Sequence, residues 1–169
     1  MFSRLRAPVR RRLRIPVVAS AALGLIVSLG PAGVAGASTL ATGGGLITGT
    51  AFTVTGVEQR GPITILTANI QDQYAGLLSG TATGTFRQIT NSSTGSSVIE
   101  GTERCICTVA GQTGTIQIRF FGQAAAGGAT RGNLVVERGE GGPTGLHGAG
   151  TFEGNLFAPL PYTVTVVAP

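Results

Sequence analysis

The chain has 169 residues and a formal net charge of +5, it contains neither lysine nor tryptophan, and six of its twelve arginines lie in the first fourteen residues. After Ala37 only six arginines remain against seven acidic residues, so the body of the protein is almost neutral. A near-neutral body lacks the basic surface that phosphate backbones require, and this excludes nucleic acid as an expected partner.

Residues 1–37 are typical of a secretory signal peptide. The arginine-rich start leads into an apolar run at 15–29, a Gly-Pro pair at 30–31 and the small residues 35–37, which is the order of a cleaved export signal. We therefore expect a secreted protein without membrane association after cleavage. An uncleaved anchor is the alternative, although the apolar run is short for a membrane span. The arginine cluster leaves both the general secretory and the twin-arginine route open.

The rest of the chain has the pattern of strands. Apolar residues and threonines alternate, glycines separate the runs, and no long amphipathic helical period follows residue 40. We expect a flexible leader at 38–46 and a single all-β domain at 47–168. Eight strands are predicted, at 49–58, 63–74, 77–90, 97–109, 114–122, 131–138, 149–153 and 162–167. Short connections between such strands favour an antiparallel eight-stranded barrel.

The third predicted strand, 77–90, shows the clearest alternation. Its outward face carries Thr81, Thr83, Thr85 and Arg87, and its inward face carries Leu78, Gly80, Ala82, Gly84 and Phe86. The inward side chains are unusually small, which has two interpretations. Small residues allow a sheet to bend sharply and close. They also leave volume in a slim barrel for one small guest molecule.

The fourth predicted strand, 97–109, carries the richest chemistry. Its more apolar face consists of Ile99, Gly101, Glu103, Cys105, Cys107 and Val109, and we place this face inward. Glu103 is then an interior carboxyl group beside two cysteines. On the next strand, Ile118 and Phe120 are expected to line the same core, with Gln117 and Arg119 pointing outward.

The order of the glycine motifs over about residues 47–167 resembles an uncharacterised bacterial family, a domain of unknown function. The motifs are 49–54 (GTAFTV), 78–84 (LSGTATG), 101–104 (GTER), 111–115 (GQTGT), 131–132 (RG), 145–152 (GLHGAGTF) and 162–163 (YT). The resemblance implies a small calycin-type barrel like that of allene oxide cyclase. It implies no reaction, and no catalytic residue of that enzyme maps onto this chain. Phe121 stands where the family pattern has a polar residue.

Glu103 is the strongest candidate for a catalytic residue. A carboxyl group on an apolar wall loses hydration, and this raises its pKa. Such a group can act as a general acid or base, or anchor a hydroxyl group of a ligand. The alternative is a structural acid tied to a neighbouring arginine or to the backbone of a turn.

Three states are open for Cys105 and Cys107, which lie two residues apart on one face. They can be packed thiols, a strained disulfide or a redox or metal site. We expect no metal site and no cofactor, because too few ligands accompany them. His147, the single histidine, is expected to be a solvent-exposed loop side chain.

The sequence thus predicts a secreted β-barrel protein of uncharacterised activity that binds a small hydrophobic molecule. Phe52, Phe86, Cys105 and Phe120 are the expected ligand-lining residues. Two alternatives belong to other functional classes. One is a lyase- or isomerase-like enzyme that uses Glu103, and the other is a structural extracellular protein with a packed interior. No recognisable catalytic constellation decides among them.

Overall fold

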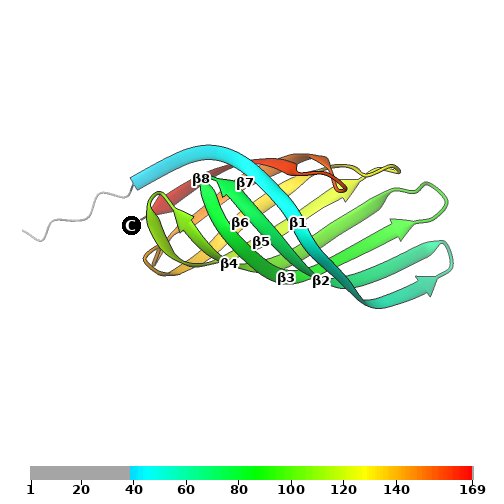
Figure 1. The fold of residues 1–169 in the computed structure, drawn as a ribbon. Coiled ribbons are helices and arrows are strands. Elements are labelled where there is room, and N and C mark those ends of the chain that lie inside the picture. Colours follow the sequence, from blue (N-terminus) through cyan, green and yellow to red (C-terminus); the bar gives the residue numbers. More distant parts are fainter. Residues whose placement is uncertain (1–38, 169) are drawn as a thin grey trace, which may run out of the picture. The chain divides into compact units, whose positions relative to one another are not determined.

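The computed structural model describes residues 39–168, which form strands joined by turns and short loops. The strands are β1 (Thr39–Arg60), β2 (Ile63–Gly76), β3 (Leu78–Asn91), β4 (Ser97–Val109), β5 (Gln112–Ala124), β6 (Ala129–Gly141), β7 (His147–Asn155) and β8 (Leu160–Ala168). Consecutive strands pair antiparallel, and β8 returns to pair with β1, so the sheet closes on itself as a barrel (Figure 1). Within the described residues, no helix has the length and apolarity to cross a membrane.

The expectation of an all-β domain with eight antiparallel strands is confirmed. From β2 onward, each strand begins and ends within three residues of its predicted bounds, and β4 matches them at both ends. The turn residues were reliable markers because the hairpins are short and use glycine at positive φ, as at Gly61 and Gly111. The predicted signal peptide at 1–37 lies outside the described residues and stays a prediction.

The prediction of a flexible leader at 38–46 is wrong from Thr39 onward. Residues from Thr39 to Ile47 form the first part of β1 and pair with β8, which closes the ring. The glycines of this segment permit close contact between strands. A Cβ atom on Gly45 would lie 2.7 Å from the Tyr162 hydroxyl and would overlap the carbonyl oxygen of Ala75. The glycine run is therefore a site of tight packing in the sheet.

The second part of β1 has a partner on one side only. Past Ile47 the strand continues to Arg60 in pairing with β2, while β8 begins at Leu160, opposite Ile47. Register shifts between Gly49 and Ala51 and between Val54 and Gly56 bend this part of β1. The wall of the barrel consequently lacks a strand on one side of β1, next to the β7–β8 turn.

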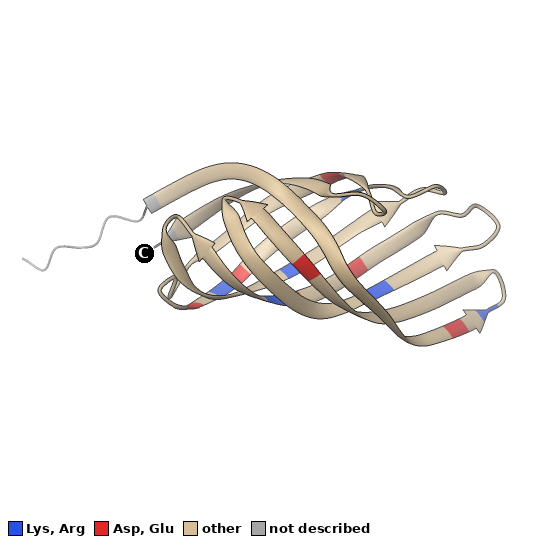
Figure 2. Cartoon of the chain, in the orientation of Figure 1, with Lys and Arg blue, Asp and Glu red and all other residues tan. Residues whose placement is uncertain are grey.

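The side-chain alternation predicted for the third and fourth strands is confirmed. Every inward position of β4 is buried except the partly buried Gly101, and Thr102 and Arg104 are exposed. The core cluster consists of Tyr74, Leu78, Ala82, Ile99, Cys105, Cys107, Val109, Ile116, Ile118, Leu134, Val136, Leu146, Phe152, Tyr162, Val164 and Val166. The charged residues are few and scattered over several strands (Figure 2).

The small inward residues of β3 allow an unusually close approach to β4. A Cβ atom on Gly84 would overlap the carbonyl oxygen of Thr102 and would lie 2.9 Å from Cγ of Glu103. Gly80 likewise has no room for a side chain against the backbone of Ile106. Because β3 fills so little of the interior here, side chains from β2 and β4 can meet across it.

Candidate functional site

A cavity of about 640 Å³ lies inside the ring of strands. It is lined by residues of all eight strands and of the β7–β8 turn, namely Ile47, Thr48, Gly49, Thr50, Ala51, Phe52, Ile70, Asp72, Tyr74, Phe86, Gln88, Ile99, Glu103, Phe120, Leu134, Phe152, Leu156, Phe157, Ala158, Pro159 and Leu160. Phe52 and Phe157 are 54% and 85% exposed, so they mark its mouth. The volume and the largely apolar wall are typical of small-molecule sites.

Glu103 lies in the wall of this cavity and is only 2% exposed. The Tyr74 hydroxyl donates a hydrogen bond of 2.5 Å to its Oε2 atom. Tyr74 is on β2 and Glu103 on β4, and the two meet because Gly84 on the intervening strand pairs with Glu103 and adds no side chain. The inward placement expected for Glu103 is thus observed, with a tyrosine as its partner.

The second carboxylate oxygen of Glu103, Oε1, is buried and has no hydrogen-bond partner among the described residues. Burial, and after it the neighbouring carboxyl group of Asp72, raises the pKa of Glu103 to about 9. Glu103 therefore carries a proton at neutral pH. Since Tyr74 already donates to Oε2, the proton belongs on Oε1, and the neighbouring carboxyl group of Asp72, which also lines the cavity, can accept it.

Tyr74 is held firmly in this arrangement. Its ring packs edge-on against Tyr162, with the ring centroids 5.8 Å apart. The Tyr162 hydroxyl accepts a 2.9 Å hydrogen bond from the Leu78 amide and donates a 3.0 Å bond to the Leu78 carbonyl. Burial raises the pKa of Tyr74 well above its usual value, and the nearby Glu103 adds to this effect. Tyr74 is consequently a neutral donor.

Neither Tyr74 nor Asp72 was predicted to be a site residue from the sequence. Both face the cavity from β2, in alternation with exposed Gln71 and Gln73. The signal was present, because Ile70 precedes them on the same face. It was overlooked because a strand pattern shows which residues share a face and gives no information on which strand lies opposite.

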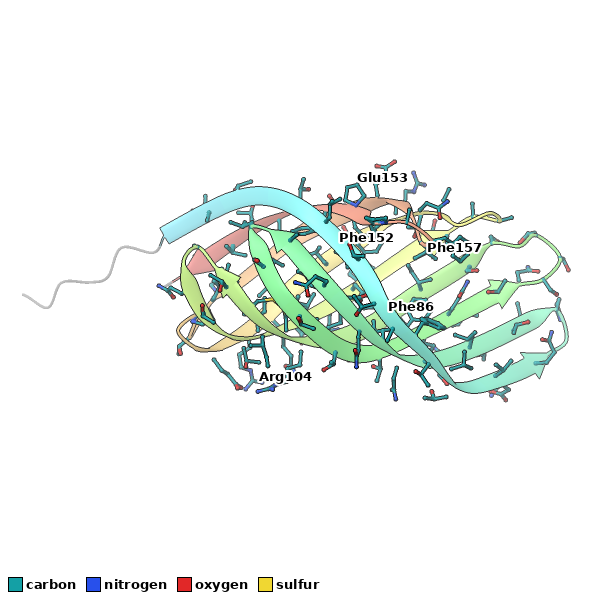
Figure 3. All side chains as sticks on the ribbon, viewed as in Figure 1. Phe86, Arg104, Phe152, Glu153 and Phe157 are labelled. Atoms are coloured by element: carbon teal, nitrogen blue, oxygen red, sulfur yellow. A yellow bond between two sulfur atoms is a disulfide. The ribbon has the colours of Figure 1, made fainter. Side chains whose placement is uncertain are left out.

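Three phenylalanines form a continuous aromatic wall. The ring centroids of Phe52 and Phe86 are 5.5 Å apart, and those of Phe86 and Phe120 are 6.3 Å apart. Gly101 pairs with both Phe86 and Phe120, and a Cβ atom there would overlap the Phe120 ring. Phe152 and Phe157 approach from the β7–β8 side, whereas Arg104 points away from the interior (Figure 3).

The expected ligand-lining residues divide into two groups. Phe52, Phe86 and Phe120 line the cavity, whereas Cys105 is fully buried in the core and does not. Cys105 is joined to Cys107 by a disulfide, with the Cα atoms 5.3 Å apart. Among the three states left open by the sequence, the structure shows the disulfide. His147 is exposed as expected, but it is the first residue of β7 and not a loop residue, and its Nδ1 atom lies 3.1 Å from the Gly145 carbonyl oxygen.

The disulfide leads to a first prediction. The folded protein is expected to take up no iodoacetamide, because neither cysteine is free and Cys105 and Cys107 are at most 1% exposed. Denaturation alone should also give no modification, whereas denaturation with a reductant should add two carbamidomethyl groups. Intact-mass spectrometry checks all three conditions. Labelling of the denatured, unreduced protein would show that the two sulfurs are thiols.

Comparison with known proteins gives a family and a fold. A family model described as "Protein of unknown function (DUF3224)" matches residues 47–163. The crystal structure of a DUF3224 protein with unknown function from Shewanella oneidensis MR-1 is similar, with a TM-score of 0.64 and 19% sequence identity. The alignment covers 79% of this chain and 98% of that one, and at this identity the likeness shows the fold alone. A search among curated proteins gave no match.

Proposed function

Because the chain belongs to the DUF3224 family, whose function is unknown, we propose a function from the geometry of the cavity. The protein binds a small apolar molecule inside the barrel and holds it through the carboxyl group of Glu103. The observation that carries this proposal is the Oε1 atom of Glu103, which is buried in the cavity wall without a partner. A buried polar atom without a hydrogen bond is costly, and a bound ligand would satisfy it.

The cavity itself argues against the purely structural alternative. Protein interiors are close-packed and have few voids larger than a water molecule. The cavity of about 640 Å³ opens to solvent beside Phe52 and Phe157, and the rings of Phe52, Phe86 and Phe120 border it with apolar surface that no side chain fills. An apolar ligand would cover these rings and so remove their surface from water.

Acid–base catalysis is the second candidate function. The protonated Glu103 favours it, since a carboxyl group with a raised pKa can donate a proton to a bound substrate at neutral pH. The reaction class that we propose for this catalysis is lyase- or isomerase-like. In that case Glu103→Gln would retain binding and abolish turnover, because an amide can form the hydrogen bond but cannot supply the proton.

We also propose that the protein is exported and that its barrel is of the allene-oxide-cyclase-like type. A disulfide is normal in secreted proteins and rare in the reducing cytosol, so the Cys105–Cys107 bond supports secretion. An allene-oxide-cyclase-like barrel is in keeping with eight antiparallel strands around a cavity. Detection of the protein in the culture medium with its N-terminus near residue 38 would test the export proposal.

Binding is expected for a neutral apolar probe, N-phenyl-1-naphthylamine, whose fluorescence rises in apolar surroundings. Gly49→Trp should weaken this binding at least about tenfold. Gly49 faces the cavity, and a Cβ atom there would meet only the Oδ1 atom of Asp72, at 3.5 Å, so an indole ring has room to occupy the ligand's place. Fluorescence titration of the purified protein measures both affinities.

The matched control is Thr53→Trp. Thr53 lies on the same strand, pairs with the exposed Asn69 and does not line the cavity, so this variant should bind the probe like the unmodified protein. Equal loss of binding in both variants would place the probe on the outer surface. Absence of any binding by the unmodified protein would refute the apolar-ligand proposal.

A further inference from the structure

The ionisable side chains that line the cavity are all acidic groups. Asp72 and Glu103 are its ionisable acids, and its described lining contains no arginine and no histidine. A ligand with a carboxylate head group, such as a fatty acid, would bring a third acid to this place without any cation to balance it. Burial of such an unpaired charge is strongly unfavourable. The cavity is therefore poorly suited to anionic ligands.

The groups facing Glu103 can accept a cation. Asp72 and Tyr74 reach it from β2, and Tyr162 of β8 stands behind Tyr74. Its neighbours on the adjacent strands, Gly84 and Ile118, do not titrate. An ammonium group beside Oε1 of Glu103 would find the carboxylate of Asp72 close by. It would donate hydrogen bonds to the carboxylate of Asp72 and, once Glu103 has lost its proton, to Oε1 of Glu103.

The aromatic wall suits the remainder of such a molecule. Phe52, Phe86 and Phe120 form one row of rings that leads from the exposed mouth into the barrel. Aromatic faces attract cations and pack against flat apolar groups. One end of the ligand is thus selected by the two acids and the other by the three rings.

From this arrangement we propose that the cavity binds a hydrophobic amine as its cation, with the ammonium group between Asp72 and Glu103 and an aromatic body against the phenylalanines. This inference rests on the proposed function and specifies its ligand class. Binding has a proton balance. Glu103 enters the complex as a neutral acid, the ammonium ion stabilises its carboxylate, and the proton passes to the solvent.

The test compares three molecules with the same apolar body: 4-phenylbutylamine, 4-phenylbutan-1-ol and 4-phenylbutanoic acid. At about pH 7.5 the amine should bind at least about tenfold more tightly than the alcohol, and the acid more weakly than either. Calorimetry in buffers of different ionisation enthalpy should show the release of close to one proton with the amine and none with the alcohol. In Glu103→Gln, the preference for the amine and the proton release should both fall.

The outcomes separate this inference from the function it builds on. Equal affinity for amine and alcohol, or tighter binding of the acid, would overturn amine selectivity, while binding of the neutral naphthylamine probe would still support an apolar site. If neither the probe nor any of the three molecules binds, the proposed function itself fails. Amine binding that releases no proton would remove Glu103 from the recognition of the cation.

Discussion

Replacing Glu103 by glutamine is expected to stabilise the protein at neutral pH by about 3 kcal/mol, with a gain that grows as the pH rises. The pKa of Glu103 is about 9 in the fold against an ordinary value of 4.5. Between these two values the folded state holds a proton that the unfolded chain has lost. The free energy of unfolding therefore falls as the pH increases through this window, by up to about 1.4 kcal/mol per pH unit.

Glutamine removes this dependence and keeps the shape of the side chain. Its amide oxygen can accept the hydrogen bond from Tyr74, and its NH2 group takes the place of the protonated Oε1 atom. Urea unfolding midpoints at several pH values from about 5 to 8.5 measure the difference. The two proteins should be nearly equal near pH 5 and diverge steadily above it. Parallel midpoints throughout would mean that Glu103 titrates like an exposed glutamate.

The control is Glu100→Gln, on the same strand but on its outer face. Glu100 forms an ion pair with Arg87, in which Nη1 of Arg87 donates a 2.7 Å hydrogen bond to Oε1 of Glu100, and both side chains are about half exposed. Exposed pairs of this kind contribute little, so the change in the free energy of unfolding should stay within about 1 kcal/mol. A large gain in this control would show that any loss of negative charge stabilises the protein, whatever its position.

A buried acid that lowers stability needs a reason other than folding. At neutral pH Glu103 makes one good hydrogen bond, through Oε2, and leaves Oε1 without a partner in the cavity wall. A leucine or methionine would suit an apolar wall better. Natural chains depart from such packing rules chiefly where a site requires it. The expected cost of Glu103 to stability thus supports a ligand or a substrate at Oε1.

The parts of the fold that follow from local pattern were predictable from the sequence. Alternation along β4 placed Glu103, Cys105 and Cys107 inward, because successive side chains of a strand point to opposite faces. Turn residues such as Gly61-Pro62 marked the hairpins. These signals depend only on residues that are close in sequence, and they hold in the folded protein because short turns connect consecutive strands.

The parts that depend on distant contacts were not predictable. The meeting of Tyr74 with Glu103 depends on Gly84 between them, and a single strand's pattern does not reveal such a contact across a neighbour. The glycine run at 43–45 indicated a loop by composition, although its pairing with β8 makes it part of the barrel. Composition indicates the secondary structure that a residue prefers, whereas pairing with a distant strand determines the structure that it adopts.

The contact across β3 gives the second large prediction, that Gly84→Ala destabilises the protein by about 3 kcal/mol or more. The added methyl group would overlap the carbonyl oxygen of Thr102, a backbone atom that cannot turn aside, and would lie 2.9 Å from Cγ of Glu103. Strands β3 and β4 would have to separate, which weakens their hydrogen-bond ladder. The shift would also displace Glu103 from Tyr74.

The sign of this effect makes the experiment decisive. At an unstrained site, alanine in place of glycine stabilises a protein by about 0.4–1 kcal/mol through the unfolded chain. Gly84→Ala should do the opposite, whereas Thr83→Ala, at the adjacent exposed position of β3, should stay within about 0.5 kcal/mol. Urea unfolding measures both variants. Unchanged or increased stability of Gly84→Ala would mean that β3 and β4 lie further apart, and Glu103 would then have room for another position.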